Sequence, residues 1–411
     1  MIYVHVPFCR SFCTYCDFYS EVAGRCRKAE DTRKQEALFE DFAQALACEV
    51  RSRAGEITDD VNTLYIGGGT PSVLPLSAFK TLLSVLDSVG HSGPFEEFTV
   101  EVNPEDIVDK GQAYVEGLLE LGVNRISMGV QSFDDSVLKF MNRRHDSATA
   151  KKAYSILEDA GVKNISIDLI FGLPQLSSAV WSETLEKALD ISSRGVLPQH
   201  ISSYQLSVEP GSMLARLVEK GSWSEASDEL CQEQYSALCS VLAAAGYHHY
   251  EISNFAQPGF EARHNSAYWR HVPYVGLGPG AHSYISSATP RVVSLQQGDC
   301  DVFSCRQWNL PDLQAYLSAS RTGDFSAVQE GESLDSDQIV LERIMLGLRT
   351  SAGLPESFLR DNCDSPAFAS ALATGHLVSA AGSPDSCTAE QYLRIPESYF
   401  FISDSIISSL V

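Results

Sequence analysis

Three cysteines near the start of the chain have the type and spacing that most clearly indicate chemistry. Cys9, Cys13 and Cys16 follow a short apolar run, Ile2–Val6, and are spaced C-x3-C-x2-C. Three thiolates this close together can each reach a different iron of one multinuclear centre, and they leave one iron without a protein ligand. The spacing therefore favours an iron–sulfur cluster with one open iron.

Two other interpretations of these cysteines remain open. A tetrahedral zinc site closes with a fourth Cys or His, and the next cysteine in the chain is Cys26, ten residues after Cys16. Zinc would therefore need a distant pair such as Cys300 and Cys305. The other alternative is a set of buried thiols that bind no metal.

Further polar residues stand where predicted strands end. Gly67–Pro71 (GGGTP) follow one strand, and glycines let backbone groups approach a ligand closely. Glu101 follows the next strand and suits an ammonium group or a ribose hydroxyl, while Arg143 offers a planar fork for a carboxylate. Asp168 stands among β-branched residues, where burial requires a ligand or backbone donors. A tight turn and solvated charges are the ordinary structural alternatives.

The elements that must position these residues alternate between strands and amphipathic helices. The predicted strands are Ile2–Val6, Thr63–Ile66, Phe98–Val102, Arg125–Val130, Ile165–Ile170 and Ile201–Leu206. The predicted helices between them are Arg33–Arg53, Leu76–Ser88, Gly111–Leu121, Ala148–Gly161 and Ala179–Ser193. This alternation predicts an α/β fold with parallel strands, a partial (β/α)6 TIM-type barrel, whose active site lies at the carboxyl ends of the strands. A full eight-unit barrel is the competing count.

The rest of the chain is less regular. We expect an exposed loop over Glu21–Glu36, a helix over Ser222–Ala245 and an irregular functional connection over Tyr247–Tyr284. From about Leu310 the pattern is mainly helical again. Its predicted parts are helices over Ile339–Arg349, Leu354–Leu359, Ala367–Leu377 and Ser403–Leu410, a polar turn over Gly382–Ala389 and a strand over Gln391–Ile395. These patterns divide the chain into 1–224 (barrel), 225–309 (connection) and 310–411, a small, mainly helical C-terminal domain of winged-helix type.

Composition limits the classes of function. The chain has 411 residues, 44% of them hydrophobic, and a net charge of −23, which disfavours a nucleic-acid partner. Eleven cysteines without a recognisable signal peptide indicate a reducing compartment. No apolar run reaches the roughly 18 residues of a membrane span. We expect a cytoplasmic protein, with an organelle and peripheral membrane contact left open.

The motifs together resemble the radical S-adenosylmethionine (SAM) superfamily, and within it the oxygen-independent coproporphyrinogen oxidases and the HemW-type haem chaperones. The resemblance implies a [4Fe–4S] cluster on Cys9, Cys13 and Cys16, whose open iron takes the amine and carboxylate of SAM. It also implies that Tyr15 packs on the adenine. The other implied SAM contacts are Tyr3, Gly68, Gly69, Thr70, Glu101, Gln131, Arg143 and Asp168.

Two departures favour the haem chaperones over the oxidases. The oxidases carry a further cysteine two residues after the third, and this chain has Phe18 there. His264, Tyr268 and Trp269 match the His-Asn-x-x-Tyr-Trp motif of the HemW type, which is associated with haem. An imidazole can ligate haem iron and flat aromatic rings can pack on a porphyrin, although a buried histidine with packed aromatics is the ordinary alternative.

The resemblance implies a protein that binds haem and delivers it to acceptor haemoproteins, with a cluster and SAM held at the barrel mouth. The alternative is an oxygen-independent coproporphyrinogen III oxidase, which uses a SAM-derived radical for decarboxylation. A zinc-stabilised binding module is a third, non-catalytic alternative. Whether the chain is an enzyme is left undecided, and no residue is assigned a catalytic role.

Overall fold

A computed structural model describes the chain except for residues 24–28, 58–61, 92, 287–303 and 381–389. The described residues form two compact units. The first comprises Met1–Gln234 and Pro273–Ser333, and the second comprises Tyr235–Val272 and Leu334–Val411. The division into 1–224, 225–309 and 310–411 stays a prediction. Cys26, Cys300 and the predicted turn Gly382–Ala389 lie outside the described residues.

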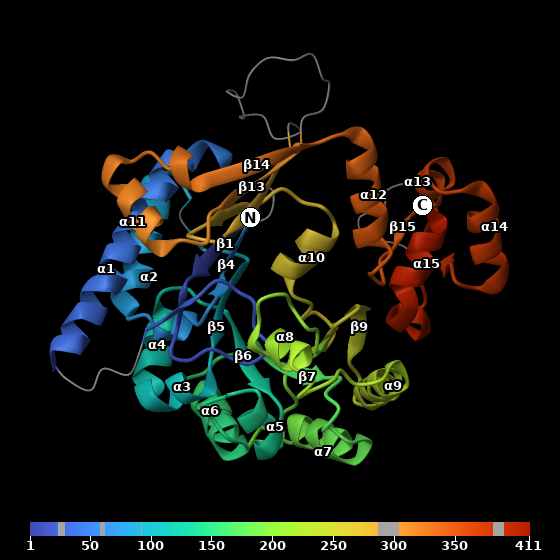
Figure 1. Cartoon of the computed structure of the whole chain (residues 1–411), viewed down its shortest axis with the longest axis horizontal. Helices are drawn as coiled ribbons and strands as arrows, with labels where there is room; N and C mark the ends of the chain where they lie inside the picture. Colours follow the sequence, from blue (N-terminus) through green and yellow to red (C-terminus); the bar gives the residue numbers. More distant parts are fainter. Residues whose placement is uncertain (24–28, 58–61, 92, 287–303, 381–389) are drawn as a thin grey trace. The chain divides into compact units, whose positions relative to one another are not determined.

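A parallel sheet forms the centre of the first unit (Figure 1). Its strands, in spatial order, are β11 (Val275–Leu277), β1 (Ile2–Val6), β4 (Thr63–Gly68), β5 (Glu97–Val102), β6 (Arg125–Gln131), β7 (Ile165–Phe171) and β8 (His200–Gln205). The six predicted strands are therefore confirmed in their predicted order. The sheet gains a seventh strand, β11, in which Val275 pairs with Ile2.

Helices follow the strands. The five predicted helices correspond to α1 (Ala29–Ser52), α2 (Leu76–Ser88), α4 (Gln112–Glu120), α6 (Ser147–Asp159) and α7 (Ser178–Leu189). Two further short helices, α3 (Pro104–Lys110) and α5 (Asp135–Phe140), have no predicted counterpart. Buried apolar side chains fill the space between sheet and helices, among them Leu64, Val100, Ile126 and Ile167 on the strands. The predicted α/β fold with parallel strands is confirmed, because each helix carries the chain back so that the next strand runs parallel to the previous one.

The predicted exposed loop over Glu21–Glu36 is wrong where it overlaps regular structure. The first two residues form the short strand β3 (Glu21–Val22), which pairs with β2 (Phe8–Cys9), and α1 already begins at Ala29. Glu30 and Asp31 lie in the first turn of α1, where acidic side chains favour the positive end of the helix dipole. The apolar period of α1 starts later, so this first part of the helix carries no hydrophobic signal.

The first unit also contains a second sheet, the helices α8 and α11, and the first residues of α9. The sheet has the order β12 (His282–Ser286), β13 (Ser304–Asn309) and β14 (Gln329–Leu334). Helix α11 (Leu313–Thr322) packs beside α1, as Figure 1 shows, and α8 (Met213–Glu219) follows β8. Helix α9 (Asp228–Ala244) lies within the predicted helix Ser222–Ala245.

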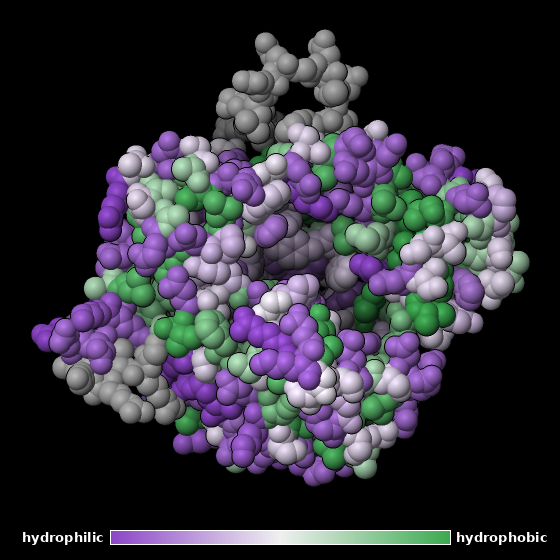
Figure 2. Space-filling model, viewed as in Figure 1, coloured by the Kyte–Doolittle hydropathy of each residue, from purple (hydrophilic) through white to green (hydrophobic). Residues whose placement is uncertain are grey.

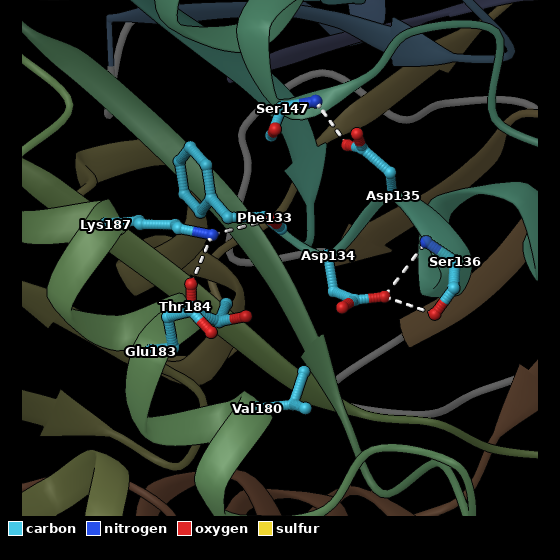
Figure 3. A pocket seen from close by; sticks show the side chains of 9 residues that line it. All are labelled: Phe133, Asp134, Asp135, Ser136, Ser147, Val180, Glu183, Thr184 and Lys187. Atoms are coloured by element: carbon cyan, nitrogen blue, oxygen red, sulfur yellow. Dashed lines mark hydrogen bonds and ion pairs between the residues drawn. The ribbon is translucent and has the colours of Figure 1, made fainter.

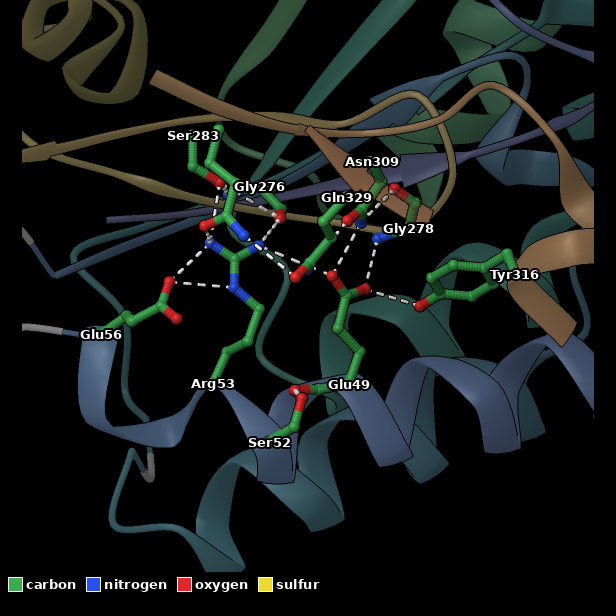
Figure 4. Close-up of polar contacts among 11 residues, drawn as sticks. Glu49, Ser52, Arg53, Glu56, Gly276, Gly278, Ser283, Asn309, Tyr316 and Gln329 are labelled. Atoms are coloured by element: carbon green, nitrogen blue, oxygen red, sulfur yellow. Dashed lines mark hydrogen bonds and ion pairs between the residues drawn. The ribbon is translucent and has the colours of Figure 1, made fainter. Parts of the chain in front are cut away.

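Two buried charged side chains, Glu49 on α1 and Arg53 directly after it, fix the end of β11 (Figure 4). Glu49 is 0% and Arg53 is 5% exposed. The carboxylate of Glu49 accepts hydrogen bonds from the Gly278 amide (2.8 Å), the Asn309 side-chain amide (2.7 Å) and the Tyr316 hydroxyl (2.6 Å). Arg53 donates to the carbonyl of Gly276 at 2.7 Å. The glycine-rich segment after β11 is therefore held from α1 by a satisfied buried network, which we call the Glu49 cluster.

The second unit is made of short elements. Its strands are β9 (His248–Glu251), β10 (Asn254–Ala256), β15 (Leu354–Pro355), β16 (Val378–Ser379) and β17 (Tyr392–Arg394), and its helices are α10 (Arg263–Trp269), α12 (Ser336–Gly347), α13 (Glu356–Asn362), α14 (Ser365–Thr374) and α15 (Ser403–Leu410). The helical C-terminal region is confirmed. The prediction of an irregular stretch over Tyr247–Tyr284 is wrong, since it contains β9 to β12 and α10. Elements of three to seven residues are too short to show a period.

The part of the chain that the structure describes contains no helix long and apolar enough to cross a membrane.

Candidate functional site

The three cysteines lie in the loop that leaves β1, at the carboxyl edge of the parallel sheet. Cys9 belongs to β2, and all three side chains are partly exposed. The loop after α5 holds this segment, because the Asn142 side-chain amide donates to the carbonyl of Phe12 at 2.6 Å. The predicted metal ligands therefore sit together on a loop that the barrel positions.

The surroundings of the thiols suit a positively charged metal centre. Burial raises the pKa of Cys9, and burial together with the neighbouring cysteines raises the pKa of Cys16 to about 12. Thiolates here therefore need a bound cation to be stable. Two donors already face the sulfurs: the Thr70 hydroxyl lies 3.4 Å from Cys9 Sγ, and Arg143 Nη1 lies 3.4 Å from Cys13 Sγ.

No three His, Cys, Asp or Glu side chains among the described residues are arranged to hold a single metal ion. A four-iron cluster takes each thiolate on a different iron and does not require that arrangement. The donor set of three thiols with hydrogen-bond donors to sulfur fits a [4Fe–4S] cluster.

The glycine-rich turn after β4 packs tightly against the cysteine loop. The Gly69 amide donates to the carbonyl of Val6 (2.8 Å), and the Thr70 amide donates to that of Phe8 (2.7 Å). A side chain at Gly69 would place its Cβ 2.7 Å from the carbonyl oxygen of Phe8, and Gly68 has φ +99°. The glycines are therefore required by a close backbone approach, here to the cysteine loop.

Two buried carboxyl groups come from β5 and β7, Glu101 near the end of its strand and Asp168 in the middle. Glu101 accepts from the Tyr65 hydroxyl (2.6 Å) and the Gly68 amide (3.2 Å), and Asp168 accepts from the Ser127 hydroxyl (3.2 Å). Burial raises the pKa of Glu101 to about 7 and that of Asp168 to about 6, both well above the ordinary values of these carboxyl groups. A bound cation would relieve this cost of burying negative charge.

Arg143 lies beyond α5 and faces both the cysteine loop and β6. Its Nη2 donates to Asn103 Oδ1 (2.6 Å) and to the carbonyl of Gly129 (2.8 Å). Its Nε is buried and has no hydrogen-bond partner within the described chain. A buried donor without an acceptor is costly, so this N–H is suited to a ligand carboxylate.

The remaining predicted SAM contacts lie on the same side of the unit. The hydroxyl of Tyr3 is 3.1 Å from His5 Nδ1, and His5 Nε2 is 2.8 Å from the carbonyl of Tyr19. Because a carbonyl only accepts, His5 carries its proton on Nε2 and Tyr3 donates to Nδ1. Tyr15 lies next to Arg143 and Cys13, and burial raises its pKa.

Gln131 ends β6 with a φ of +68°, at a point where the pairing with β7 shifts register. A side chain in the left-handed region is held there by its surroundings at a cost of about 1–3 kcal/mol, and such residues cluster at functional sites.

Sequence reasoning missed several partners of these residues. Asn103 contacts both Thr70 and Arg143, while Tyr65 and Ser127 hold the two carboxyl groups. The two-residue alternation of a strand was the available signal for Tyr65 and Ser127, because residues two apart lie on the same face of a sheet. Tyr65 thus shares a face with Gly67, and Ser127 shares a face with Gly129.

The predicted haem residues lie on α10 in the second unit. His264 is 1% exposed, and its Nε2 is 3.0 Å from the Tyr268 hydroxyl, with the two rings nearly perpendicular at 89°. Tyr268 and Trp269 are half-buried. His264 Nε2 is hydrogen-bonded to the Tyr268 hydroxyl in the structure. To ligate haem iron, this nitrogen would have to give up that hydrogen bond.

A cavity of about 300 Å³ lies in the first unit, at the start of α5 and beside α7 (Figure 3). Asp134 accepts from the first amides of α5, and Lys187 pairs with Glu183 at 2.8 Å. Its polar groups serve a helix cap and a surface ion pair, and none of the predicted site residues lines it.

Comparison with known proteins identifies the class of this fold and site. The model of the radical SAM superfamily matches residues 3–188, which include the cysteine loop and the parallel strands up to β7. The structure of coproporphyrinogen III oxidase (HemN) from Escherichia coli matches 99% of this chain and 89% of its own, with a TM-score of 0.74 and 20% identity. That likeness shows a shared fold.

Sequence relatives narrow the class. The haem chaperone HemW of Synechocystis sp. is 33% identical over 352 residues, which cover 86% of this chain and 78% of the relative. HemW of Bacillus subtilis is 32% identical, with coverage of 86% and 84%. The mitochondrial radical S-adenosyl methionine domain-containing protein 1 of Danio rerio is 34% identical, with coverage of 86% and 73%. The chain belongs to the HemW family within the radical SAM superfamily.

Proposed function

We propose that this chain is a haem chaperone, which binds haem and delivers it to acceptor haemoproteins, and that it carries a [4Fe–4S] cluster and SAM in its first unit. The similarity to HemW proteins over 86% of the chain carries this proposal. Phe18 supports a chaperone rather than an oxidase, because it stands where the oxidases have a further cysteine and cannot supply a thiol. Its side chain is 64% exposed.

Cys9, Cys13 and Cys16 would hold the cluster. When bound, the cluster supplies an open iron for the amine and carboxylate of SAM and a centre for one-electron transfer. Thr70 and Arg143 would donate hydrogen bonds to the sulfur ligands, at the distances given above. The protein thus contributes both the ligands and the donors that stabilise their negative charge.

The polar residues around the cysteine loop would bind SAM. Glu101 and Asp168 are acceptors suited to the ammonium group and the ribose hydroxyls, and protonation of these buried carboxyls makes binding of a cation pH-dependent. Arg143 would direct its unpaired Nε–H to the carboxylate. Tyr15 would pack against the adenine.

Haem would bind through α10 in the second unit. His264 supplies an imidazole, while Tyr268 and Trp269 supply aromatic surfaces for the porphyrin. The hydrogen bond between His264 Nε2 and the Tyr268 hydroxyl would have to be exchanged if this nitrogen became the iron ligand.

A paired assay tests the choice between chaperone and oxidase. The reconstituted protein is titrated with haem, and in parallel it is incubated anaerobically with coproporphyrinogen III, SAM and a reductant. We expect stoichiometric haem binding and no decarboxylation. Formation of harderoporphyrinogen or protoporphyrinogen would instead establish an oxidase.

The haem site is tested by His264→Ala, which should alter the Soret band and speed haem loss to an acceptor such as apomyoglobin. His376→Ala is the matched control, because His376 belongs to the same unit and packs against Tyr399 instead. Equal spectra and equal transfer rates for both variants would remove His264 from the proposed site.

A cysteine replacement tests the cluster. Cys9, Cys13 and Cys16 changed together to Ala should abolish iron incorporation, while Cys231→Ala and Cys239→Ala should retain it, since these two thiols belong to α9 and not to the cysteine loop. Iron and sulfide analysis after anaerobic reconstitution gives the result. Full iron content in the triple variant, or zinc without iron in the wild type, would contradict the cluster.

A further inference from the structure

Asn103 occupies a helix cap position without capping the helix. It directly precedes α3 and has the extended backbone of an N-cap residue, with φ −98° and ψ 142°. An asparagine at this position ordinarily accepts a hydrogen bond from the first turn of the helix, which stabilises the protein by about 1 kcal/mol. Here the side chain makes no such bond. Its amide group is engaged toward the cysteine loop instead.

The orientation of this amide is fixed by Arg143. Arg143 Nη2 lies 2.6 Å from one end of the amide, and a guanidinium can only donate, so that end must be the oxygen. The amide nitrogen then faces Thr70 Oγ1 at 3.2 Å. The reversed amide would set two donors against each other at 2.6 Å, which excludes it.

The direction of the Thr70 hydroxyl follows from this orientation. Thr70 accepts from Asn103, and its single proton is therefore available to Cys9 Sγ, 3.4 Å away. At the other end, Arg143 Nη1 donates to Cys13 Sγ at 3.4 Å. One connected set of hydrogen bonds, the Asn103 network, thus joins two of the proposed sulfur ligands through Thr70, Asn103 and Arg143.

The backbone of Asn103 is also held in place. Its amide donates to Ser72 Oγ (3.2 Å), which in turn donates to the buried Asp106 (2.8 Å). Arg10, one residue after Cys9, pairs with the same Asp106 at 3.1 Å. These contacts fix the backbone position of Asn103. A side chain that orients other groups needs such a fixed backbone.

We infer that Asn103 is a positioning residue that keeps the Thr70 proton on the Cys9 sulfur and thereby raises the reduction potential of the proposed cluster. The inference rests on the proposed function, since it assumes a cluster on Cys9, Cys13 and Cys16. Hydrogen bonds to cluster sulfurs tune the potential, and a donor favours the more negative, reduced state.

The experiment measures the reduction potential of the reconstituted full chain without SAM, by a redox titration monitored by electron paramagnetic resonance. Thr70→Val keeps the shape but removes the hydroxyl, and it should lower the one-electron equilibrium constant for reduction up to about tenfold, which is 59 mV. Thr70→Ser keeps the hydroxyl and should restore a potential near that of the wild type.

Asn103→Asp tests the positioning role. A carboxylate accepts the Thr70 proton and draws it away from Cys9, and its added negative charge also lowers the potential. The double variant with Thr70→Val separates these effects, because only the charge effect persists without the hydroxyl. The potential shift caused by Asn103→Asp should therefore be larger when Thr70 is present than in the Thr70→Val background.

Each outcome decides one claim. A wild-type chain that incorporates no iron overturns the proposed cluster and this inference with it. A loaded wild type whose potential equals that of Thr70→Val overturns the inference alone, and equal shifts by Asn103→Asp in both backgrounds remove Asn103 from it. Iron content and circular dichroism confirm each variant's assembly. If Thr70→Val loses the cluster, Thr70→Ala takes its place in the same comparison.

Discussion

Glu101 shows how one buried carboxyl links ligand binding to stability. In the folded chain burial raises the pKa of Glu101 to about 7 from its ordinary value of 4.5, although Tyr65 and Gly68 donate hydrogen bonds to it. Between these two pH values the unfolded chain has lost this proton while the folded chain keeps it. The free energy of unfolding therefore falls as the pH rises through this window.

Glu101→Gln should remove this pH dependence from the ligand-free protein. At about 1.36 kcal/mol per pKa unit, we expect the variant to gain about 2–3 kcal/mol relative to the wild type between pH 5 and pH 8. Urea unfolding at both pH values measures it. Asp134→Asn is the control, since hydrogen bonds within the cap of α5 lower the pKa of Asp134, and it titrates below this window. Parallel wild-type and Glu101→Gln profiles would contradict the raised pKa.

Arg143→Ala should weaken SAM binding by about 1.5–3 kcal/mol, the range for a charge-assisted hydrogen bond, or roughly 10- to 150-fold in Kd. Calorimetry on reconstituted protein of equal iron content measures the change. Arg144→Ala is the matched control, because the neighbouring Arg144 pairs with Glu105 at 3.4 Å. Unchanged affinity in Arg143→Ala would mean that its buried Nε–H does not meet the ligand.

At the scale of elements, the Glu49 cluster joins α1, α11 and the segment after β11. The hydroxyl of Tyr316 donates to the Glu49 carboxylate at 2.6 Å, and both side chains are fully buried. A buried hydrogen bond to a charged group contributes more than a neutral one, because the remaining charge loses a donor that water cannot replace.

Tyr316→Phe should therefore lower the free energy of unfolding by about 1.5–3 kcal/mol. Tyr114→Phe is the same chemical change at a neutral acceptor, since the Tyr114 hydroxyl donates to the carbonyl of Leu74 at 3.1 Å, and it should cost about 0.5–1.5 kcal/mol. Chemical denaturation of the ligand-free chain gives both values. An equal cost for the two variants would show that the Glu49 charge adds nothing.

Most elements of the first unit could be predicted from the sequence, because each strand and each long helix has its own apolar pattern. Leu76–Ser88 is helical as predicted, and Ile2–Val6 forms the predicted strand. The three residues of β11 could not be predicted as a partner of β1. Parallel pairing between segments some 270 residues apart leaves no local signal in the sequence, and the Glu49 cluster that holds the end of β11 is itself made of residues far apart in the chain.

The candidate site likewise contains residues that could be predicted from the sequence and residues that could not. Motif residues such as Thr70 and Arg143 could be predicted, since they stand where strands or the following helices end. Asn103 could not, because its position before Pro104 indicates an ordinary helix cap, and only the three-dimensional contacts show that its amide orients Thr70. The burial that shifts the pKa of Glu101 is likewise a property of the assembled sheet.

At the scale of the whole molecule, the candidate sites belong to different compact units. The cysteine loop and the proposed SAM contacts lie in the first unit, and α10 lies in the second. The face of the molecule in Figure 2 is largely hydrophilic, with scattered apolar patches, in keeping with the net charge of −23. Local apolar contacts, rather than this overall charge, would govern porphyrin binding.

Hydrogen exchange should report the two ligands separately. SAM at about 100 times its Kd adds about 2.7 kcal/mol to the state that binds it, so exchange should slow in peptides covering 67–71 and 125–131 of the first unit. Haem should slow exchange in peptides covering α10. Mass spectrometry of the reconstituted chain with each ligand gives both maps. Protection of α10 by SAM alone would contradict separate sites.

The position of β11 has a consequence for biosynthesis. Ile2 pairs with Leu64 on one side and with Val275 on the other, so the strand that leads into the cysteine loop is an open edge until Val275–Leu277 has been translated. At about 5–20 residues per second, this interval lasts roughly 15–55 s. The hydrogen-bond partners of Glu49 are also translated long after it, since Gly278, Asn309 and Tyr316 follow it by 229, 260 and 267 residues. The loop that would hold the proposed cluster is therefore fully supported only after most of the chain has been translated.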